Sequence, residues 1–194
     1  MPEELALSDY QLDLRARVLA APTVPAPAPW RPADDHMVAI GGLLAVGFAT
    51  HPGNGRDLLL VASSTGLGLF DTTTGERLAR DRDDESGWVE DDLTCQGIGP
   101  VAHLRVPMAG LDGGGLHTGA PGWAVDVVSP DWPSHRVLLS TGSPFFSGAH
   151  GESWWQVFHA NYSELRAAGF SPSGATLVVA TSSDIGLWTR TPQA

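Results

Sequence analysis

The clearest pattern of hydrophobic and polar positions occurs twice along the chain, in residues 45–71 and 167–190. Short apolar runs alternate with turns of glycine, proline and polar residues, as AVGFATHPGNGRDLLLVASSTGLGLFD and then AAGFSPSGATLVVATSSDIGLWTR. When Ala62 is aligned with Ala180, the apolar and glycine positions of the two stretches coincide. Such runs and turns predict antiparallel strands joined by hairpins, so the sequence predicts a repeated three-stranded unit.

Further strands extend this pattern into a larger fold. In the first unit, a turn at residues 72–75 precedes a fourth strand at residues 77–81. Four antiparallel strands form one blade, and blades of about 40–45 residues allow at most four in this chain. We therefore expect an all-β fold, a small β-propeller-like array of about three to four antiparallel blades. The array forms a single domain over residues 1–194, with the blades in residues 37–194.

A looser third copy is predicted in the middle of the chain. Residues 123–128 and 136–140 predict two of its strands, separated by a turn that contains two prolines. Two earlier strands of this copy are expected near residues 104–108 and 116–118.

The N-terminal segment, residues 1–36, allows two interpretations. Residues 10–18 alternate apolar and polar positions, which favours a strand that pairs with the last blade and closes the ring. Ser8 and Gln11 have the spacing of a helix capping box, which favours a helix instead. Residues 21–32 are rich in proline and predict an extended strap over the surface.

Composition and charge exclude several functions. Eleven basic residues, all arginine, stand against 22 acidic ones, and the net charge of −11 disfavours binding to nucleic acid or to an anionic membrane. The absence of lysine excludes a phosphate-loop lysine and a Schiff-base lysine. A single cysteine, Cys95, cannot form an internal disulfide. No apolar run reaches membrane-spanning length and the start does not resemble a secretory signal, so we expect a soluble cytoplasmic protein.

The repeat resembles bacterial WD40-like β-propeller repeat proteins, including short uncharacterised ones. The resemblance rests on residues 169–188, GFSPSGATLVVATSSDIGLW, which end in an aromatic strand as such blades do. It covers about half of the chain and implies a propeller fold. Thr189 follows Trp188 where the family usually has aspartate, so the polar cluster that orders many such blades cannot be carried over; only Asp71, after Phe70, matches that position.

Candidate sites for metals and cofactors are weak. Asp81, Asp83, Glu85 and Asp92 occupy calcium-loop positions in an acidic stretch. Ser86 stands where the sharp turn requires glycine, so a solvated acidic loop is the better interpretation. The seven histidines have no metal-binding spacing, and we expect neither another metal nor a cofactor.

Aromatic residues give the best candidates for a partner site. We predict that the side chains that contact a partner are Phe145, Phe146, Trp154, Trp155, Trp132 and Trp88. In a regular strand, Trp154 and Trp155 point to opposite faces, so one indole would be exposed; the alternative is that these rings fill the core between blades.

The favoured function is a non-enzymatic protein-binding module of the immunity, inhibitor or scaffold type, whose partner has a basic face. The alternative is a hydrolase-like small-molecule enzyme with a histidine and aspartate site. A third hypothesis is a homo-oligomer in which incomplete propellers pair.

Overall fold

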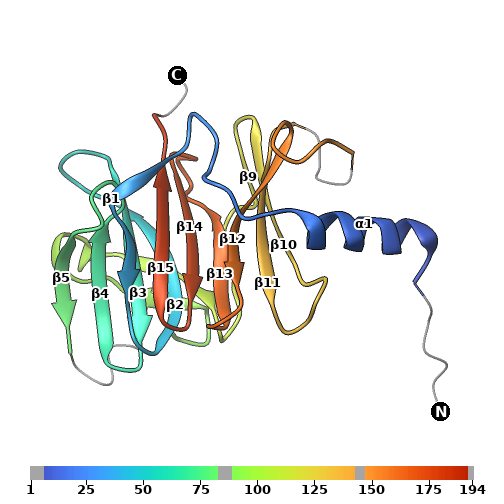
Figure 1. Cartoon of the computed structure of the whole chain (residues 1–194). Helices are drawn as coiled ribbons and strands as arrows, with labels where there is room; N and C mark the ends of the chain where they lie inside the picture. The colour runs from blue at the N-terminus through green and yellow to red at the C-terminus, as the bar shows by residue number, and fades with distance from the viewer. Residues whose placement is uncertain (1–6, 83–88, 143–146, 192–194) are drawn as a thin grey trace, which may run out of the picture.

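The computed structural model of the chain describes residues 7–82, 89–142 and 147–191 (Figure 1). The fold is all-β, with four antiparallel sheets and one helix. Within these described residues, none of the sheets closes on itself. The expectation of an all-β protein is confirmed.

The first repeat unit forms a five-stranded sheet. Its strands, in spatial order, are β5 (Arg77–Asp81), β4 (Gly66–Asp71), β3 (Asp57–Ser63), β2 (Leu43–Thr50) and β8 (Ala109–Gly110). The predicted turn and fourth strand of this unit are confirmed. The short strand β8 comes from a distant part of the chain and pairs with the edge of β2.

The second repeat unit forms the central four-stranded sheet, in the order β1 (Arg31–Ala39), β15 (Asp184–Thr189), β14 (Thr176–Thr181) and β13 (Leu165–Phe170). Ala62 pairs with Leu67 in the first sheet, and the aligned Ala180 pairs with Ile185 in the second. Residues that are aligned in the two repeat units therefore occupy the same position in their strand pairs. The structure confirms that the two stretches are copies of one strand pattern.

The third sheet contains β12 (Trp154–Ala160), β11 (His135–Ser140), β10 (Trp123–Val128) and β9 (Gly119–Ala120). The predicted strands at 123–128 and 136–140 are confirmed. The strand expected near residues 116–118 is present slightly later in the chain, as β9, whereas the strand expected at 104–108 does not belong to this sheet. Residues 105–107 form β7 (Arg105–Pro107), which pairs with β6 (Thr94–Gln96) in a separate two-stranded sheet. Strand β12 completes the sheet; its Trp155 packs between the central and third sheets, whereas its Trp154 lies beneath α1.

Helix α1 (Asp9–Ala20) decides between the two N-terminal interpretations. The Ser8 hydroxyl accepts a hydrogen bond from the Gln11 amide, and the Gln11 side chain accepts one from the Ser8 amide. This capping box satisfies amides that would otherwise lack partners at the helix start. The strand interpretation of residues 10–18 is therefore wrong. The helix is too short and too polar to cross a bilayer, and it is the one α-helix among the described residues.

The strand that completes the last repeat unit is β1, which follows the proline-rich strap. It pairs with β15 from Arg31 opposite Thr189 to Ala39 opposite Asp184. Pro32 is tolerated because β1 is the edge strand and needs amide donors on one side only. The amide of Asp35 also donates to the carbonyl of Thr74 in the turn after β4, at 2.8 Å. Strand β1 therefore ties the first two sheets together.

The sheets pack face to face in layers, with the central sheet buried on both faces. One core cluster joins it to the five-stranded sheet, through side chains such as Val61 and Val178. A second joins it to the third sheet through Val179 and Val137, and a third lies between the five-stranded sheet and the β6–β7 hairpin. Helix α1 lies beyond the third sheet, at one end of the molecule (Figure 1).

Substitution of Ser8 by alanine tests the helix cap. Loss of an N-cap hydroxyl is expected to destabilise α1 by about 1 kcal/mol. Because Val18 is the one buried side chain of the helix, this loss should appear mainly as local opening. Hydrogen exchange at the amides of the first turn measures it. Unchanged exchange in Ser8→Ala would show that the capping box does not stabilise the helix.

Candidate functional site

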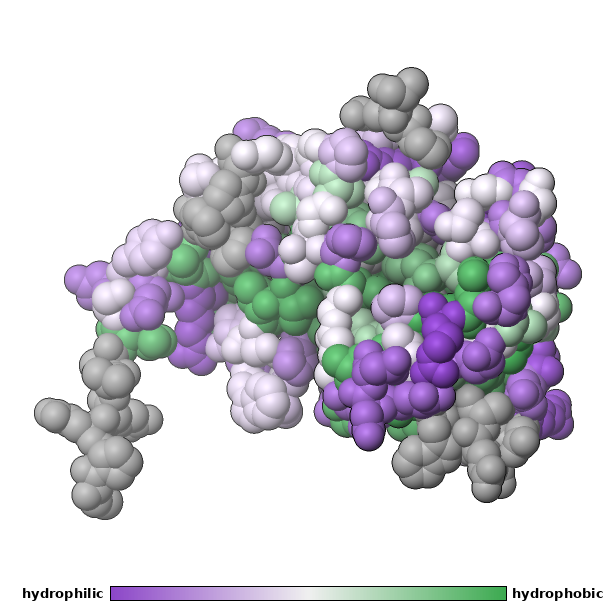
Figure 2. All heavy atoms as spheres, turned by 180° about the vertical axis from the view of Figure 1, so that it is seen from behind, coloured by the Kyte–Doolittle hydropathy of each residue, from purple (hydrophilic) through white to green (hydrophobic). Residues whose placement is uncertain are grey.

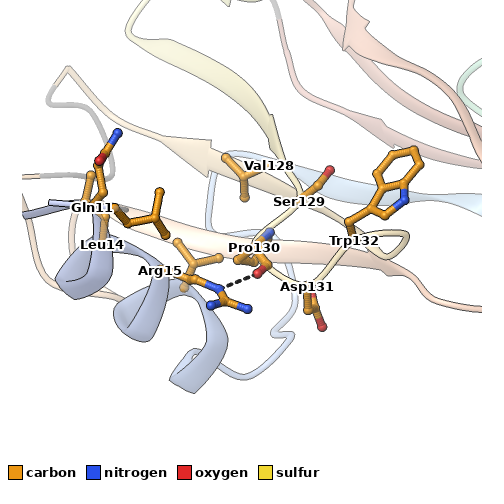
Figure 3. A pocket seen from close by; sticks show the side chains of 10 residues that line it. Gln11, Leu14, Arg15, Val128, Ser129, Pro130, Asp131 and Trp132 are labelled. Carbon is orange, nitrogen blue, oxygen red and sulfur yellow. Dashed lines mark hydrogen bonds between the residues drawn. The ribbon is translucent and has the colours of Figure 1, made fainter. Parts of the chain in front are cut away.

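An open apolar groove lies between helix α1 and the turn that joins β10 to β11 (Figure 3). Its volume is about 800 Å³. The apolar side chains that line it come from the two sides and are Leu7, Leu14, Val18, Val128, Pro130 and Trp132. From the back, hydrophobic side chains are visible at the surface where the projecting helix joins the body (Figure 2). We call this the α1 groove.

The inner end of the α1 groove is fixed by a small core cluster. Val18 is 3% exposed and packs with Leu138 and Trp154 on the outer face of the third sheet. The indole nitrogen of Trp154 donates to the carbonyl of Gly148 at 3.0 Å. Since the indole is both buried and hydrogen-bonded, it anchors the C-terminal half of α1 firmly.

Two arginines fasten the helix to neighbouring loops. Nε of Arg15 donates to the carbonyl of Pro130 at 2.6 Å, across the groove (Figure 3). A guanidinium nitrogen of Arg17 donates to the carbonyl of Gly148. These contacts leave most of the helix surface in solvent, with the apolar side chains of Tyr10, Leu12 and Leu19 exposed.

The opposite side of the groove presents Trp132, which is 77% exposed. Its ring contacts the His135 ring edge-on, with centroids 5.6 Å apart. Nδ1 of His135 in turn lies 2.7 Å from the hydroxyl of Ser129. The turn is therefore held by side-chain contacts while its tryptophan remains available to a ligand.

An ion pair between Arg136 and Asp131 also holds this turn. Arg136 is 7% exposed and pairs with Asp131 at the lip of the groove. The hydrogen bond from Arg136 lowers the pKa of Asp131 below its usual value. Burial, followed by the positive charge of Arg136, lowers the pKa of the neighbouring His159. His159 therefore stays neutral at pH 7 and does not compete with Arg136 for the carboxylate.

The Asp131–Arg136 ion pair makes stability depend on pH. A carboxyl whose pKa is lower in the folded chain stabilises it fully above the unfolded pKa, and loses this effect as the pH falls through the folded value. The difference in free energy of unfolding between the wild type and Asp131→Asn should therefore shrink as the pH falls from about 5 to below 3. Solvent screens the half-exposed carboxylate, so the expected difference is about 1 kcal/mol. Urea unfolding at several pH values measures it, and a constant difference would contradict the role of the pair.

The predicted aromatic partner residues have different positions. Trp132 lies at the α1 groove, whereas Trp154 is 1% exposed beneath it. Trp155 is half-buried and packs 5.9 Å from Trp123, in the core between the central and third sheets. A bulge opposite Val137 interrupts the strict alternation that was expected for this strand. Three further candidates, Phe145, Phe146 and Trp88, lie outside the described residues.

Of the four residues in the weak calcium candidate, only Asp81 and Asp92 are among the described residues. Asp83 and Glu85 lie outside the described residues. The Asp92 carboxylate accepts hydrogen bonds from the amide and hydroxyl of Thr94 and lies 3.5 Å from Arg105. Asp81 ends β5. Within the described part of the chain, no three histidine, cysteine or acidic side chains are grouped as metal ligands would be.

Sequence reasoning missed the helix side of the groove. Leu7, Gln11, Leu14 and Val18 are spaced three to four residues apart and face the turn. The helical interpretation of residues 10–18 contains this signal, because that spacing places them on one helix face. The distance in sequence to Trp132 gave no indication that the two sides meet.

The fold and site together define an all-β protein of layered antiparallel sheets with an apolar groove between its helix and a sheet turn. No family model, curated protein or solved structure matches the chain.

Proposed function

We propose that this chain is a non-enzymatic protein-binding module that holds an amphipathic helix of a partner protein in the α1 groove. The observation that carries the proposal is the exposure of Trp132, at 77%, opposite an apolar helix face. Exposed aromatic side chains beside a groove are typical of protein-binding sites, where tryptophan often dominates the binding energy.

The shape of the groove favours a helical segment. Helix α1, which has twelve residues and is about 18 Å long, supplies one wall. A second helix laid along this wall would place side chains at positions i, i+4 and i+7 between Leu7, Leu14 and Trp132. The wall is held by hydrogen bonds from Arg15 and Arg17, so binding does not need to order it.

The charge of the chain favours a basic partner. With a net charge of −11, the protein attracts a segment whose polar face carries arginine or lysine. Such attraction accelerates association and weakens with salt. An immunity, inhibitor or scaffold protein that acts on a basic partner in the bacterial cytoplasm fits this chemistry.

We further propose that the layered sheets are blades of a small propeller-like array, as the resemblance to WD40-like repeats implies. The shared register of the two repeat units and the addition of β1 to the last of them support this arrangement. An experimental structure in which the strands do not radiate from a common axis would overturn it.

Selection from a displayed library of helical peptides tests the binding proposal. We expect the enriched peptides to carry apolar anchors at helical spacing with basic flanks, and to bind more slowly as salt is added. Trp132→Ser and Leu14→Gln should each weaken these peptides by at least about tenfold. Tyr162→Ser is the matched control, because Tyr162 is 97% exposed and lies outside the groove.

Two results would contradict the proposal. Peptides without apolar anchors, or equal binding by the Trp132 and Tyr162 variants, would exclude the α1 groove as their site.

Sedimentation of the unliganded chain addresses the homo-oligomer. A dimer that Trp132→Ser dissociates would show that a second copy, and not a partner, occupies the groove.

A further inference from the structure

The outer edge of the five-stranded sheet is formed by β5, which lies at the far left of Figure 1. In an antiparallel sheet, alternate residues of an edge strand direct their amide and carbonyl groups away from the sheet. Across the described residues, residues 77–80 make no backbone hydrogen bond outside their ladder with β4. The outer side of β5 is therefore free to pair with a further strand.

The chain itself covers three other edge strands, β12, β13 and β1. The strap runs along β12, where the Val24 amide donates to the carbonyl of Gln156 at 2.9 Å. The Phe170 amide of β13 donates to the carbonyl of His117, and β1 is bonded to the turn after β4. An uncovered edge recruits other chains, so folded proteins cover such strands or place charges on them. Since β5 is not covered in this way, its side chains decide what it can recruit.

Arginines are concentrated on this strand. Three of the eleven arginines of the chain are Arg77, Arg80 and Arg82, and all three are exposed. Arg80 donates to the carbonyl and the hydroxyl of Thr65, at 3.0 and 2.8 Å. Within the described chain, neither Arg77 nor Arg82 forms a hydrogen bond or an ion pair through its side chain. We call residues 77–82 the arginine edge, and its positive charge contrasts with the net charge of −11 of the whole chain.

A β-bulge places two of these arginines on one face of the sheet. Phe70 pairs with Arg77 and Gly68 pairs with Arg80, so Leu78 is the extra residue of β5. Gly68 and Phe70 are two residues apart in a strand and share a face, and the residues opposite them share it too. Without the bulge, arginines three residues apart would point to opposite faces. A partner strand therefore meets both guanidinium groups on the same side.

We propose that the arginine edge binds an extended acidic segment of a partner protein, which adds a sixth strand to the five-stranded sheet. Such strand addition obtains affinity from backbone hydrogen bonds and specificity from alternate side chains. Residues that face each other in paired strands have Cβ atoms about 4.5–5.5 Å apart, so acidic side chains at alternate positions of the segment would lie beside Arg77 and Arg80. The same arginines oppose pairing with β5 of a second copy, because like charges would then face each other. This partner is extended and acidic, whereas the partner proposed for the α1 groove is helical and basic.

Fluorescence anisotropy of the full chain with a short labelled peptide of alternating valine and glutamate tests this proposal. We expect saturable binding that weakens as salt is added, and no binding of the peptide in which lysine replaces glutamate. Methylation of the peptide amides distinguishes backbone pairing from charge attraction. Because a paired strand turns only one side to its neighbour, methyl groups on one set of alternate amides should abolish binding, and those on the other set should leave it unchanged.

Two variants and one control locate the peptide. Arg77→Gln and Arg82→Gln should each weaken binding by about two- to fivefold, and the double variant by about tenfold. Arg31→Gln is the matched control and should bind as the wild type does. Arg31 is also exposed and, in the part of the chain that the structure describes, also unpaired, but it begins β1 of the central sheet. Hydrogen exchange at the amides of residues 77–80 should slow when the peptide binds.

Several results would overturn the proposal. These are absence of binding, equal binding by the Arg77 and Arg31 variants, and equal binding of the two methylated peptides. A single-stranded oligonucleotide that binds as tightly as the peptide would also overturn it, because the arginines would then attract any polyanion. Trp132→Ser should bind the acidic peptide as the wild type does, so the outcome here is independent of the outcome at the α1 groove.

Discussion

Replacement of Phe170 by alanine is expected to lower the free energy of unfolding by about 3–5 kcal/mol. Phe170 is fully buried at the end of β13, and its ring stacks on Trp30 with centroids 5.4 Å apart. Its amide also donates a hydrogen bond to the carbonyl of His117, at 2.7 Å. The ring joins the strap, the central sheet and the third sheet, so the cavity would lie where three elements meet and cannot collapse easily.

Urea unfolding followed by tryptophan fluorescence measures this loss. Tyr162→Ala is the control, since Tyr162 is 97% exposed and should change stability by less than about 0.5 kcal/mol. Equal stabilities of the two variants would show that the central and third sheets do not share a core at Phe170.

The second large effect is expected at Gly47. A Cβ at this position would lie 2.3 Å from the carbonyl oxygen of Pro107 and 2.7 Å from the sulfur of Met108. The backbone of β7 cannot move away without opening the core between the five-stranded sheet and the hairpin. Gly47→Ala should therefore lower the free energy of unfolding by about 2–3 kcal/mol.

Gly115 provides the matched control for that substitution. Nothing lies within 4 Å of a Cβ at Gly115, and its φ is not in the left-handed region. Gly115→Ala should leave stability unchanged or raise it by up to about 1 kcal/mol, because alanine restricts the unfolded chain. If Gly47→Ala proves equally harmless, the hairpin does not pack tightly on β2.

The repeat allowed much of the fold to be predicted, because turn chemistry and apolar runs are local signals. Gly47 and its repeat equivalent Gly169 illustrate this. Both permit another segment to approach closely, Pro107 in one case and Leu116 in the other. The alignment identified the pair, but not what each glycine contacts, since that depends on segments distant in sequence.

The strand β1 was missed for a physical reason. Its exposed positions carry charges, as at Asp34 and Asp35, and Pro32 interrupts it near its start. An edge strand needs only one hydrogen-bonded side, so such a sequence differs little from a strap. Local pattern therefore indicated that a closing strand was needed and selected the wrong residues for it.

The candidate site was only partly predictable. The prediction that a tryptophan is exposed to a partner is correct in placing Trp132 at the surface, but Trp154, which was predicted in the same way, is buried beneath α1. Whether an indole faces solvent depends on the register of β12 and on the helix that covers it.

The pairing of β1 with β15 also determines when the fold can form. His36 bonds to the carbonyl of Leu187, a residue 151 positions later in the chain. During synthesis β1 leaves the ribosome before β15, so it has no partner strand while the five-stranded sheet folds from contiguous segments. The central sheet is completed only after β15 emerges. Until then β1 lacks its partner strand, and β1 of another nascent chain can pair with β15 in its place, so crowded polysomes favour exchange of this strand between chains.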